Sequence, residues 1–355
     1  MDQKVTEIIA RAWEGTAPDY DEVMYLLQLP EASPEASALR AAADGIQRAK
    51  TGNAATIWGQ IGIEVYPCEA DCQFCSFGKS HTCFTEHVTM PIDEVVQRAK
   101  DFARGGDLYG LYLMTMNTYD EDYYLECVKA VRAAIPADVR MITNIGDTDV
   151  EFFRKLKDAG ISSVYHVKRI GEGELTAISP ERREATIAAA HEAGLKVEEC
   201  CEPVGAETPL ETIAARLMEI RERDEKLGGL DTTGVMMRTS VPGTRFEGLE
   251  NQITILRMAQ MNAIETLLMC DRPHAIHMGH HEANLVSLTS GSNCVTAETG
   301  FNPRDTAEDT AAGRGFDVPA VREMYYQAGF TRLMKGDGTY VDLTPEYMAA
   351  KLAEL

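Results

Sequence analysis

The sequence of 355 residues lacks any long apolar run. No stretch approaches the roughly 20 consecutive apolar residues that span a bilayer. The first 13 residues carry acidic side chains and no apolar segment of signal-peptide length. We therefore expect a cytoplasmic protein with no membrane partner.

The sequence is also poor in basic residues. It has 34 Lys and Arg against 56 Asp and Glu, a formal net charge of −22. Phosphate backbones are bound by clustered Lys and Arg, so this balance argues against a nucleic-acid partner. A small-molecule substrate is the better expectation.

A paired disulfide framework is missing as well. The nine cysteines are an odd number, and three of them, Cys68, Cys72 and Cys75, fall within a few residues of one another. Such crowding indicates metal-binding thiolates in a reducing compartment rather than disulfides.

From about residue 56 the chain alternates short β-type runs with amphipathic helical stretches. Glycine follows three expected helices, at Gly160, Gly194 and Gly329. The pattern gives about eight β/α units and predicts an α/β fold, a closed TIM-type (β/α)8 barrel, with an open doubly wound sheet as the alternative. The expected strands are 56–65, 108–116, 139–143, 162–167, 196–201, 233–239, 274–278 and 293–297.

Three regions follow from this segmentation. Residues 1–55 are predicted to be an N-terminal helical extension, and residues 56–310 the barrel. Residues 311–355 are predicted to be a C-terminal helical tail, with a Gly-rich turn at 335–338.

The strongest chemical signal is the C-x3-C-x2-C run of Cys68, Cys72 and Cys75, directly after an expected strand. A [4Fe–4S] cube has four irons, each of which needs a ligand. A short loop with this spacing can hold three corners and leave the fourth iron open to a small molecule. A structural zinc site completed by His81 or Cys83 is the alternative, although such sites use pairs of C-x2-C type.

With the aromatic Phe74 before its last cysteine, this run resembles the signature of the radical S-adenosylmethionine (radical SAM) superfamily. The resemblance implies that the open iron binds the amino and carboxylate groups of S-adenosylmethionine (SAM). One electron, from a flavodoxin or ferredoxin-type donor, then cleaves SAM to a 5′-deoxyadenosyl radical that abstracts a substrate hydrogen. Phe74 would lie near the adenine.

The order of elements from about residue 57 to 305 is similar to the biotin synthase-like branch of this superfamily. That branch includes biotin synthase, methylornithine synthase and the hydrogenase maturase that works on a diiron precursor. The supporting residues are Pro242-Gly243-Thr244, the segment 291–294, and Arg183 with its neighbours.

One departure concerns sulfur chemistry. Biotin synthases hold a sulfur-donating second cluster with cysteines on the second, third and fifth strands, where an approximate alignment gives Met114, Met141 and Glu198. Sulfur insertion of the biotin type is therefore disfavoured.

The resemblance also implies positions that bind SAM. Asn117 and Thr118, after the second strand, correspond to residues that bind the methionyl amino group. His166 and Lys168, near the fourth strand, correspond to polar residues that bind the ribose. Arg183 is expected to bind the SAM carboxylate in a bidentate manner, or else to be a solvated helix residue.

Candidate substrate ligands lie at the ends of later strands. Glu202 and Arg238 would suit a zwitterionic substrate, unless they form a buried ion pair with each other. His277 belongs to a group of four histidines at 274–281 that lines a substrate pocket or, less favourably, binds a metal.

The remaining cysteines leave a second cluster open. Cys200, Cys201 and Cys294 lie at strand ends, and because strand residues alternate, only one of the adjacent pair can face the interior. Buried free cysteines are common, so a packing role is the alternative.

The leading hypothesis is a radical SAM enzyme that rearranges or cleaves a small polar substrate, including amino-acid-derived ones, in cofactor or amino-acid biosynthesis. The first alternative is sulfur insertion, as in biotin and lipoyl synthases, by a non-standard second cluster. The second is a non-catalytic metal-binding protein that uses the three cysteines structurally.

Overall fold

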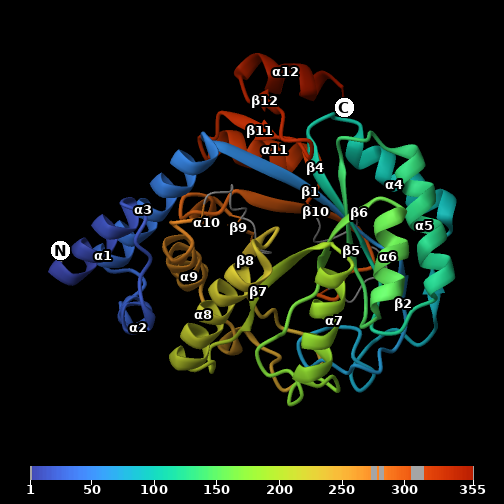
Figure 1. Cartoon of the computed structure of the whole chain (residues 1–355), viewed down its shortest axis with the longest axis horizontal. Helices are drawn as coiled ribbons and strands as arrows, with labels where there is room; N and C mark the ends of the chain where they lie inside the picture. The colour runs from blue at the N-terminus through green and yellow to red at the C-terminus, as the bar shows by residue number, and fades with distance from the viewer. Residues whose placement is uncertain (1, 273–277, 280–283, 305–315, 355) are drawn as a thin grey trace.

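The computed structural model describes residues 2–272, 278–279, 284–304 and 316–354. Within these residues, a ring of parallel strands forms the centre of the molecule (Figure 1). Its strands, in ring order, are β1 (Ala54–Gly62), β4 (Leu108–Met114), β5 (Arg140–Asn144), β6 (Ile161–Tyr165), β7 (Lys196–Val204), β8 (Thr233–Met237), β9 (Met278–Gly279) and β10 (Cys294–Gly300).

Strand β1 closes the ring because it pairs with β4 on one side and with β10 on the other. The pairing with β10 runs from Thr56 opposite Cys294 to Gly62 opposite Gly300. All of β1 is buried, as expected for a parallel strand with a packed interior on one face and helices on the other. The closed ring confirms the predicted barrel and rules out the open doubly wound sheet.

Helices between the strands cover the outside of the ring (Figure 1). The predicted stop signals lie where expected. Gly160 follows α6 (Val150–Asp158) with a φ of 104°, and Gly194 follows α7 (Pro180–Glu192) with a φ of 81°. Residues with a Cβ disfavour this left-handed conformation, so glycine ends the helix before the next strand. The helices that lie between the ring strands are α4 (Ile92–Ala103), α5 (Glu121–Ala134), α6 (Val150–Asp158), α7 (Pro180–Glu192), α8 (Leu210–Leu227), α9 (Ile255–Leu268) and α10 (Leu285–Leu288).

The N-terminal segment forms α1 (Gln3–Trp13), α2 (Tyr20–Gln28) and α3 (Pro34–Thr51). The Gln260 amide on α9 donates to the carbonyl of Leu26 at 2.8 Å, and Lys50 on α3 donates to the carbonyl of Met269 at 2.7 Å. These bonds cap carbonyl groups at helix ends, so the segment is held against α9 by polar contacts as well as apolar packing.

The C-terminal segment contains α11 (Val318–Gln327) and α12 (Pro345–Ala353), separated by a hairpin of β11 (Arg332–Met334) and β12 (Tyr340–Asp342). Strand β11 adds to the start of β1, with Ala54 opposite Arg332 and Ala55 opposite Leu333. The sequence analysis expected only helices around a Gly-rich turn. That turn is the connection of the hairpin, whose strands are too short to give a periodic pattern.

A loop follows β1 at the end of the barrel where the strands finish. A two-stranded ribbon of β2 (Glu64–Val65) and β3 (Val88–Thr89) encloses the loop, with Glu64 opposite Thr89. The three closely spaced cysteines lie in this loop. A short 3-10 helix, η1 (Leu249–Asn251), lies between β8 and α9.

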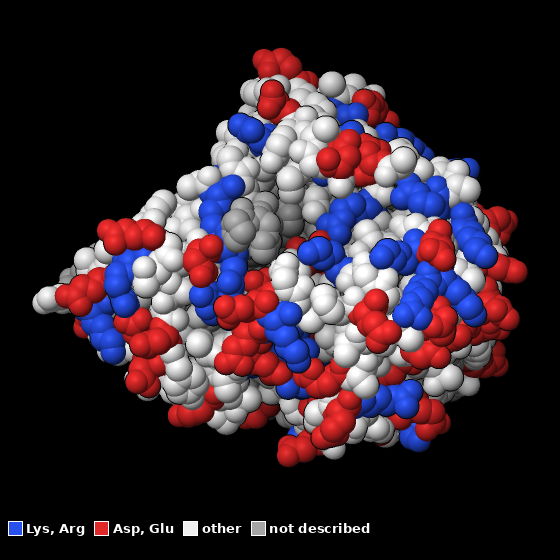
Figure 2. All heavy atoms as spheres, in the orientation of Figure 1, with Lys and Arg blue, Asp and Glu red and all other residues white. Residues whose placement is uncertain are grey.

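The surface is rich in charge. Figure 2 shows acidic and basic side chains intermingled over one face of the molecule. Among the helices in the described part of the chain, none has the length and apolar character needed to cross a membrane.

Candidate functional site

The cysteine loop is folded by hydrogen bonds between its own backbone groups. The Cys68 amide donates to the carbonyl of Phe77 at 2.8 Å, the Cys75 amide donates to that of Cys72 at 3.1 Å, and the Lys79 amide donates to that of Cys68 at 3.1 Å. The loop therefore holds all three cysteines with backbone bonds, and the Cys72 thiol also donates to the carbonyl of Ala70 at 3.8 Å.

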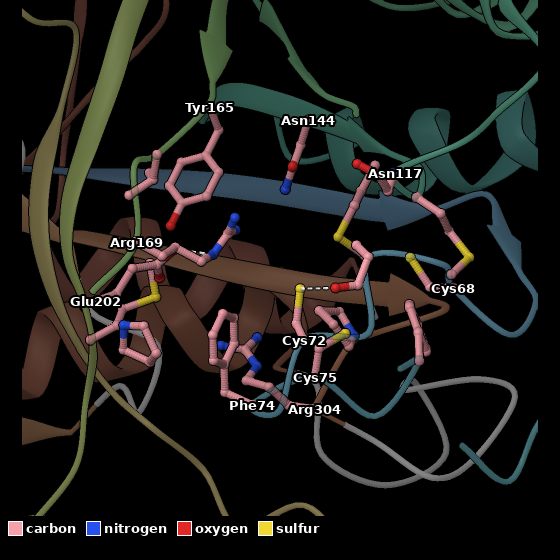
Figure 3. Close-up of a pocket in the computed structure, with 18 of the residues that line it drawn as sticks. Cys68, Cys72, Phe74, Cys75, Asn117, Asn144, Tyr165, Arg169, Glu202 and Arg304 are labelled. Atoms are coloured by element: carbon pink, nitrogen blue, oxygen red, sulfur yellow. Dashed lines mark hydrogen bonds and ion pairs between the residues drawn. The ribbon is translucent and has the colours of Figure 1, made fainter. Parts of the chain in front are cut away.

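The three thiols line one cavity of about 190 Å³ at the carboxyl ends of the barrel strands (Figure 3). This is the edge at which parallel barrels place their active sites. Phe74 lies in the same wall as the cysteines. Six neighbouring strands of the ring, β1, β4, β5, β6, β7 and β8, each contribute a side chain near their carboxyl end. In the same order, these residues are Gln60, Met114, Asn144, Tyr165, Glu202 and Arg238.

The donor set suits an iron–sulfur cluster. Burial raises the pKa of the Cys72 thiol to about 12 and raises that of Cys75 as well. Thiolates in such a place need a strongly positive partner, which iron provides. Within the described residues, no group of three or more His, Cys, Asp and Glu side chains converges tightly enough for a single metal ion. His81, a possible fourth ligand of a zinc site, instead places Nε2 2.7 Å from the carbonyl oxygen of Cys75.

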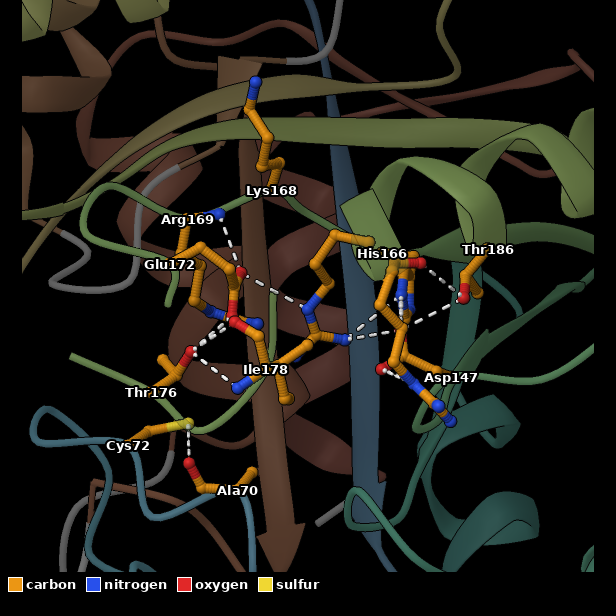
Figure 4. Close-up of polar contacts among 12 residues, drawn as sticks. Ala70, Cys72, Asp147, His166, Lys168, Arg169, Glu172, Thr176, Ile178 and Thr186 are labelled. Atoms are coloured by element: carbon orange, nitrogen blue, oxygen red, sulfur yellow. Dashed lines mark hydrogen bonds and ion pairs between the residues drawn. The ribbon is translucent and has the colours of Figure 1, made fainter. Parts of the chain in front are cut away.

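A polar network centred on Asp147 borders the cavity (Figure 4). The Oδ1 atom of Asp147 lies 2.9 Å from His166 Nε2 and 3.3 Å from Arg183 Nη1, and it accepts a hydrogen bond from Thr186 at 3.0 Å. Although burial alone would raise the pKa of Asp147, the His166 hydrogen bond and the charge of Arg183 hold it below the usual range. Asp147 is thus a fixed anion, and sequence reasoning missed it.

His166 and Arg183, which the resemblance assigned to SAM, both line the cavity and are oriented by acidic neighbours. Burial and the nearby Arg183 lower the pKa of His166 below its ordinary value, so its ring is neutral at pH 7. Arg183 is 6% exposed and also pairs with Glu172, with Nε 3.3 Å from Oε2. It is not the solvated helix residue of the alternative interpretation.

Asn117 and Thr118, the two positions after the second strand that were assigned to SAM, differ in whether they reach the cavity. Asn117 lines the cavity, and its buried Oδ1 has no hydrogen-bond partner among the described residues. Thr118 is not one of the residues that line the cavity, and its backbone amide donates to the Tyr66 hydroxyl at 3.2 Å. An unpartnered buried oxygen is costly unless a ligand satisfies it.

Arg169 is a further cavity residue that sequence reasoning missed, whereas Lys168 lies outside the lining. The Arg169 guanidinium stands 6.0 Å from the centre of the Phe74 ring, and its Nε lies 3.1 Å from Glu202 Oε1. Lys168 instead pairs with Glu219 and, at 3.3 Å, with Glu184. Lys168 was assigned by its correspondence to the ribose-binding positions of the biotin synthase-like branch, but β6 ends at Tyr165, and Lys168 lies in the segment beyond it.

Glu202 and Arg238 both line the cavity but do not form the buried pair considered as their alternative. Glu202 pairs with Arg169, and Arg238 makes a bidentate pair with Glu207, both bonds being 2.6 Å. Arg238 also lies over the Phe246 ring at 3.6 Å. The guanidinium is therefore held in place from two sides. His277 lies outside the described residues.

The other cysteines are arranged as the alternation of strand faces predicts. Cys200 lines a second cavity inside the barrel together with Cys294, while Cys201 is packed in the hydrophobic core outside the ring. Met141, predicted for the interior of the third strand, also lies in that outer core, whereas Asn144 on the same strand lines both cavities.

Residues 66–206 match the radical SAM superfamily. The chain contains a radical SAM domain. The matched span begins just before the cysteine loop and ends after Glu202, so it covers the three thiols, Asp147, His166 and Arg169. Members of this superfamily use a [4Fe–4S] cluster and SAM, as the sequence predicted.

Curated relatives place the chain near biotin synthases. It is 24% identical over 201 residues to the biotin synthase of Desulforudis audaxviator, covering 54% of this chain and 60% of the relative. It is 24% identical over 249 residues to that of Nitratidesulfovibrio vulgaris, covering 66% and 65% respectively. The matched region thus spans less than two thirds of either relative.

Solved structures with the same fold include two hydrogenase maturases and methylornithine synthase. HydG, a maturase of the [FeFe]-hydrogenase, has a TM-score of 0.76 with 17% identity, covering 94% of this chain and 76% of HydG. HydG from Carboxydothermus hydrogenoformans gives 0.75 with 17% identity, covering 94% and 79%. Methylornithine synthase, PylB, gives 0.74 with 18% identity, covering 91% and 96%. These likenesses confirm the barrel fold.

Proposed function

We propose that the chain is a radical SAM enzyme that rearranges or cleaves a small polar substrate inside its barrel. The observation that carries the proposal is that three cluster-type thiols and the ends of six barrel strands share one cavity. A bound cluster and SAM supply a 5′-deoxyadenosyl radical, and a cavity at the mouth of the barrel can bring a substrate carbon next to it. A flavodoxin or ferredoxin-type protein is the proposed electron donor.

The residues around the cavity have separate roles in this proposal. Cys68, Cys72 and Cys75 hold the cluster, and Phe74 packs beside the adenine. The unpartnered Oδ1 of Asn117 supports a contact with an ammonium group such as that of the methionyl moiety.

The second group of proposed contacts lies across the cavity. His166, neutral and fixed by Asp147, is suited to hydrogen-bond a ribose hydroxyl. Arg183 is already shared by two carboxylates, so Arg169 is an additional candidate for the SAM carboxylate. Lys168 and Thr118, also assigned to SAM from the sequence, are the weaker candidates because neither lines the cavity.

Rearrangement or bond cleavage is favoured over sulfur insertion by the barrel interior. At the strands where biotin synthases hold a second cluster, the interior side chains are Met114, Asn144 and Glu198. Two thiols, Cys200 and Cys294, reach the inner cavity among the described residues. Two are fewer than the four ligands of a common cluster. Sulfur insertion remains the second candidate because the curated relatives are biotin synthases.

Anaerobic reconstitution tests the proposal. Reconstituted protein should bind about four irons per chain, one cube, and release 5′-deoxyadenosine from SAM on addition of a strong reductant. Cys72→Ser should abolish both, whereas the matched change Cys83→Ser, in the same loop, should leave both intact. Loss of metal in Cys83→Ser would instead favour the zinc site, and metal retention without SAM cleavage would favour a non-catalytic protein. Clearly more than one cube of iron would favour sulfur insertion.

A further inference from the structure

A second, inner cavity of about 70 Å³ lies within the barrel, below the cluster-side cavity. Gln60, Asn144, Tyr165 and Met236 line both cavities, so the two are adjoining compartments. A water molecule needs about 10–15 Å³ by this measure, so the inner compartment has room for the end of a small ligand of a few heavy atoms.

Two acidic residues line the inner cavity, Glu198 and Glu199, and Glu198 is the one without a cation in the described part of the chain. It is 0% exposed, and its two carboxyl oxygens accept hydrogen bonds from the Tyr112 hydroxyl at 2.6 Å and from the Ser163 hydroxyl at 3.1 Å. Tyr112 comes from β4 and Glu198 from β7, so the first bond spans the interior of the barrel. Both partners are neutral donors.

The other acidic side chains on the described ring strands each have a cation. Glu199 pairs with Arg216 and Arg223, Glu202 with Arg169, and Glu298 with Arg304. Glu198 has no ion pair within the described residues. The inner cavity is likewise lined there by no Lys, Arg or His side chain.

The charged groups next to Glu198 do not neutralise it. Arg140 on β5 is the nearest cation that affects it, but this guanidinium is paired with Asp231 at 2.5 Å. Cys294 on β10 and Cys200 on β7 are thiols whose pKa values burial raises, so they are uncharged. Burial, with Asp231 adding to it, raises the pKa of Glu198 to about 8.

Aromatic rings complete this compartment. Tyr112 and Tyr165 meet edge to face, with ring centres 6.4 Å apart, and Trp58 stacks on Tyr112 at 5.2 Å. The Tyr165 hydroxyl makes no hydrogen bond of standard geometry to a described residue. Aromatic faces beside a buried carboxyl group favour an organic cation, whereas a carboxylate ligand would be repelled and would leave Glu198 uncompensated.

We propose that the inner cavity binds an ammonium group of the substrate, with Glu198 as its counter-ion and the rings of Tyr112 and Tyr165 as its walls. The substrate is then a primary amine whose reacting carbon lies in the outer cavity, toward the cysteine loop. This inference rests on the proposed function for the outer cavity, but ammonium binding itself requires no turnover.

Proton release is the measurable sign of this binding. At pH 7 the Glu198 carboxyl is mostly protonated, because its pKa is about 8. An ammonium ligand binds its ionised form, so complex formation expels the carboxyl proton to the buffer. Between pH 6 and 7 the ionised fraction, and with it the affinity, should rise roughly tenfold.

The experiment uses reconstituted protein with SAM and without reductant. Propylamine, 1-propanol and propionate are titrated calorimetrically at pH 7 in two buffers of different ionisation enthalpy. We expect propylamine to bind with release of about one proton and the other two probes to bind at least about tenfold more weakly, a difference of about 1.4 kcal/mol. Glu198→Gln should remove the proton release and lower propylamine affinity at least tenfold.

Glu265→Gln is the matched control. Glu265 on α9 is also fully buried with a pKa of about 8, but it does not line the inner cavity. Its variant should keep propylamine binding and proton release. If Glu198→Gln does not fold, proton release by the wild-type protein decides the question.

Three results overturn the inference: no binding of propylamine, tighter binding of propanol or propionate, or binding without proton release. These failures differ from failure of the proposed function. Protein that releases 5′-deoxyadenosine but does not bind propylamine lacks only the ammonium site. Protein that binds propylamine with proton release but never cleaves SAM lacks only the radical chemistry.

Discussion

Replacing Asp147 by Asn tests the polar network beside the cavity. The carboxylate accepts hydrogen bonds from Thr186 and Arg182, at 3.0 Å each, and pairs with His166 and Arg183. Asparagine keeps the shape but removes the charge, and its amide presents a donor to a site filled with donors. The buried guanidinium of Arg183 then loses one of its two anionic partners.

The expected cost follows from burial. The side chains of Asp147 and Arg183 are 3% and 7% exposed, and breaking a buried pair costs about 3–5 kcal/mol. Because Arg183 keeps Glu172, we expect the low end, about 3 kcal/mol. Since His166 and Arg183 also lose their orientation, SAM affinity should fall at least tenfold, about 1.4 kcal/mol.

Two measurements on Asp147→Asn check this. Chemical unfolding gives the stability change, and calorimetric titration with SAM, at a temperature where the variant is folded, gives the affinity. The control is Arg182→Ala, since this side chain is 65% exposed and its loss should cost less than about 1 kcal/mol. A variant as stable as the parent, with unchanged SAM affinity, would refute the assigned role of the network.

Three further predictions concern other parts of the molecule. Arg169→Met, which leaves Glu202 without its cation, should lower release of 5′-deoxyadenosine at least tenfold, while Lys168→Met should change it less than threefold. Asp107→Asn should destabilise the fold by about 3 kcal/mol in thermal or chemical unfolding, because it breaks a fully buried pair with Arg322 whose atoms lie 2.6 Å apart. Because burial lowers the pKa of His166, its contribution to stability is full above about pH 6.5 and is lost as pH falls through the folded-state pKa. Unfolding curves of the parent protein between pH 7 and 5.5 should show this loss of stability. In His166→Gln, the part of the pH-dependent loss that comes from His166 should be absent.

The sequence was sufficient for the barrel because its evidence repeats along the chain. Alternating apolar runs and helices recur along the chain, with glycine after several of the helices, so an error in one boundary does not change the fold. The cysteine spacing was similarly sufficient, since it depends on local chain geometry alone.

Positions that depend on where a strand stops could not be predicted as well. Lys168 was assigned by its correspondence to family positions near the fourth strand, but β6 ends at Tyr165, and beyond it Arg169 rather than Lys168 lines the cavity. Met141 was placed in the interior, whereas it faces the outer core. The Asp147 network joins residues from three segments, and no local pattern marks such a meeting.

Strand β1 pairs with β11 at Ala54 and Ala55 and with β10 from Thr56 onward. A ribosome makes β1 early but delivers β10 and β11 only after most of the chain. Throughout that interval one side of β1 would offer unpaired amide and carbonyl groups to any passing extended segment. The nascent protein should thus depend on chaperones until β10 emerges, and fragments truncated before Cys294 should aggregate.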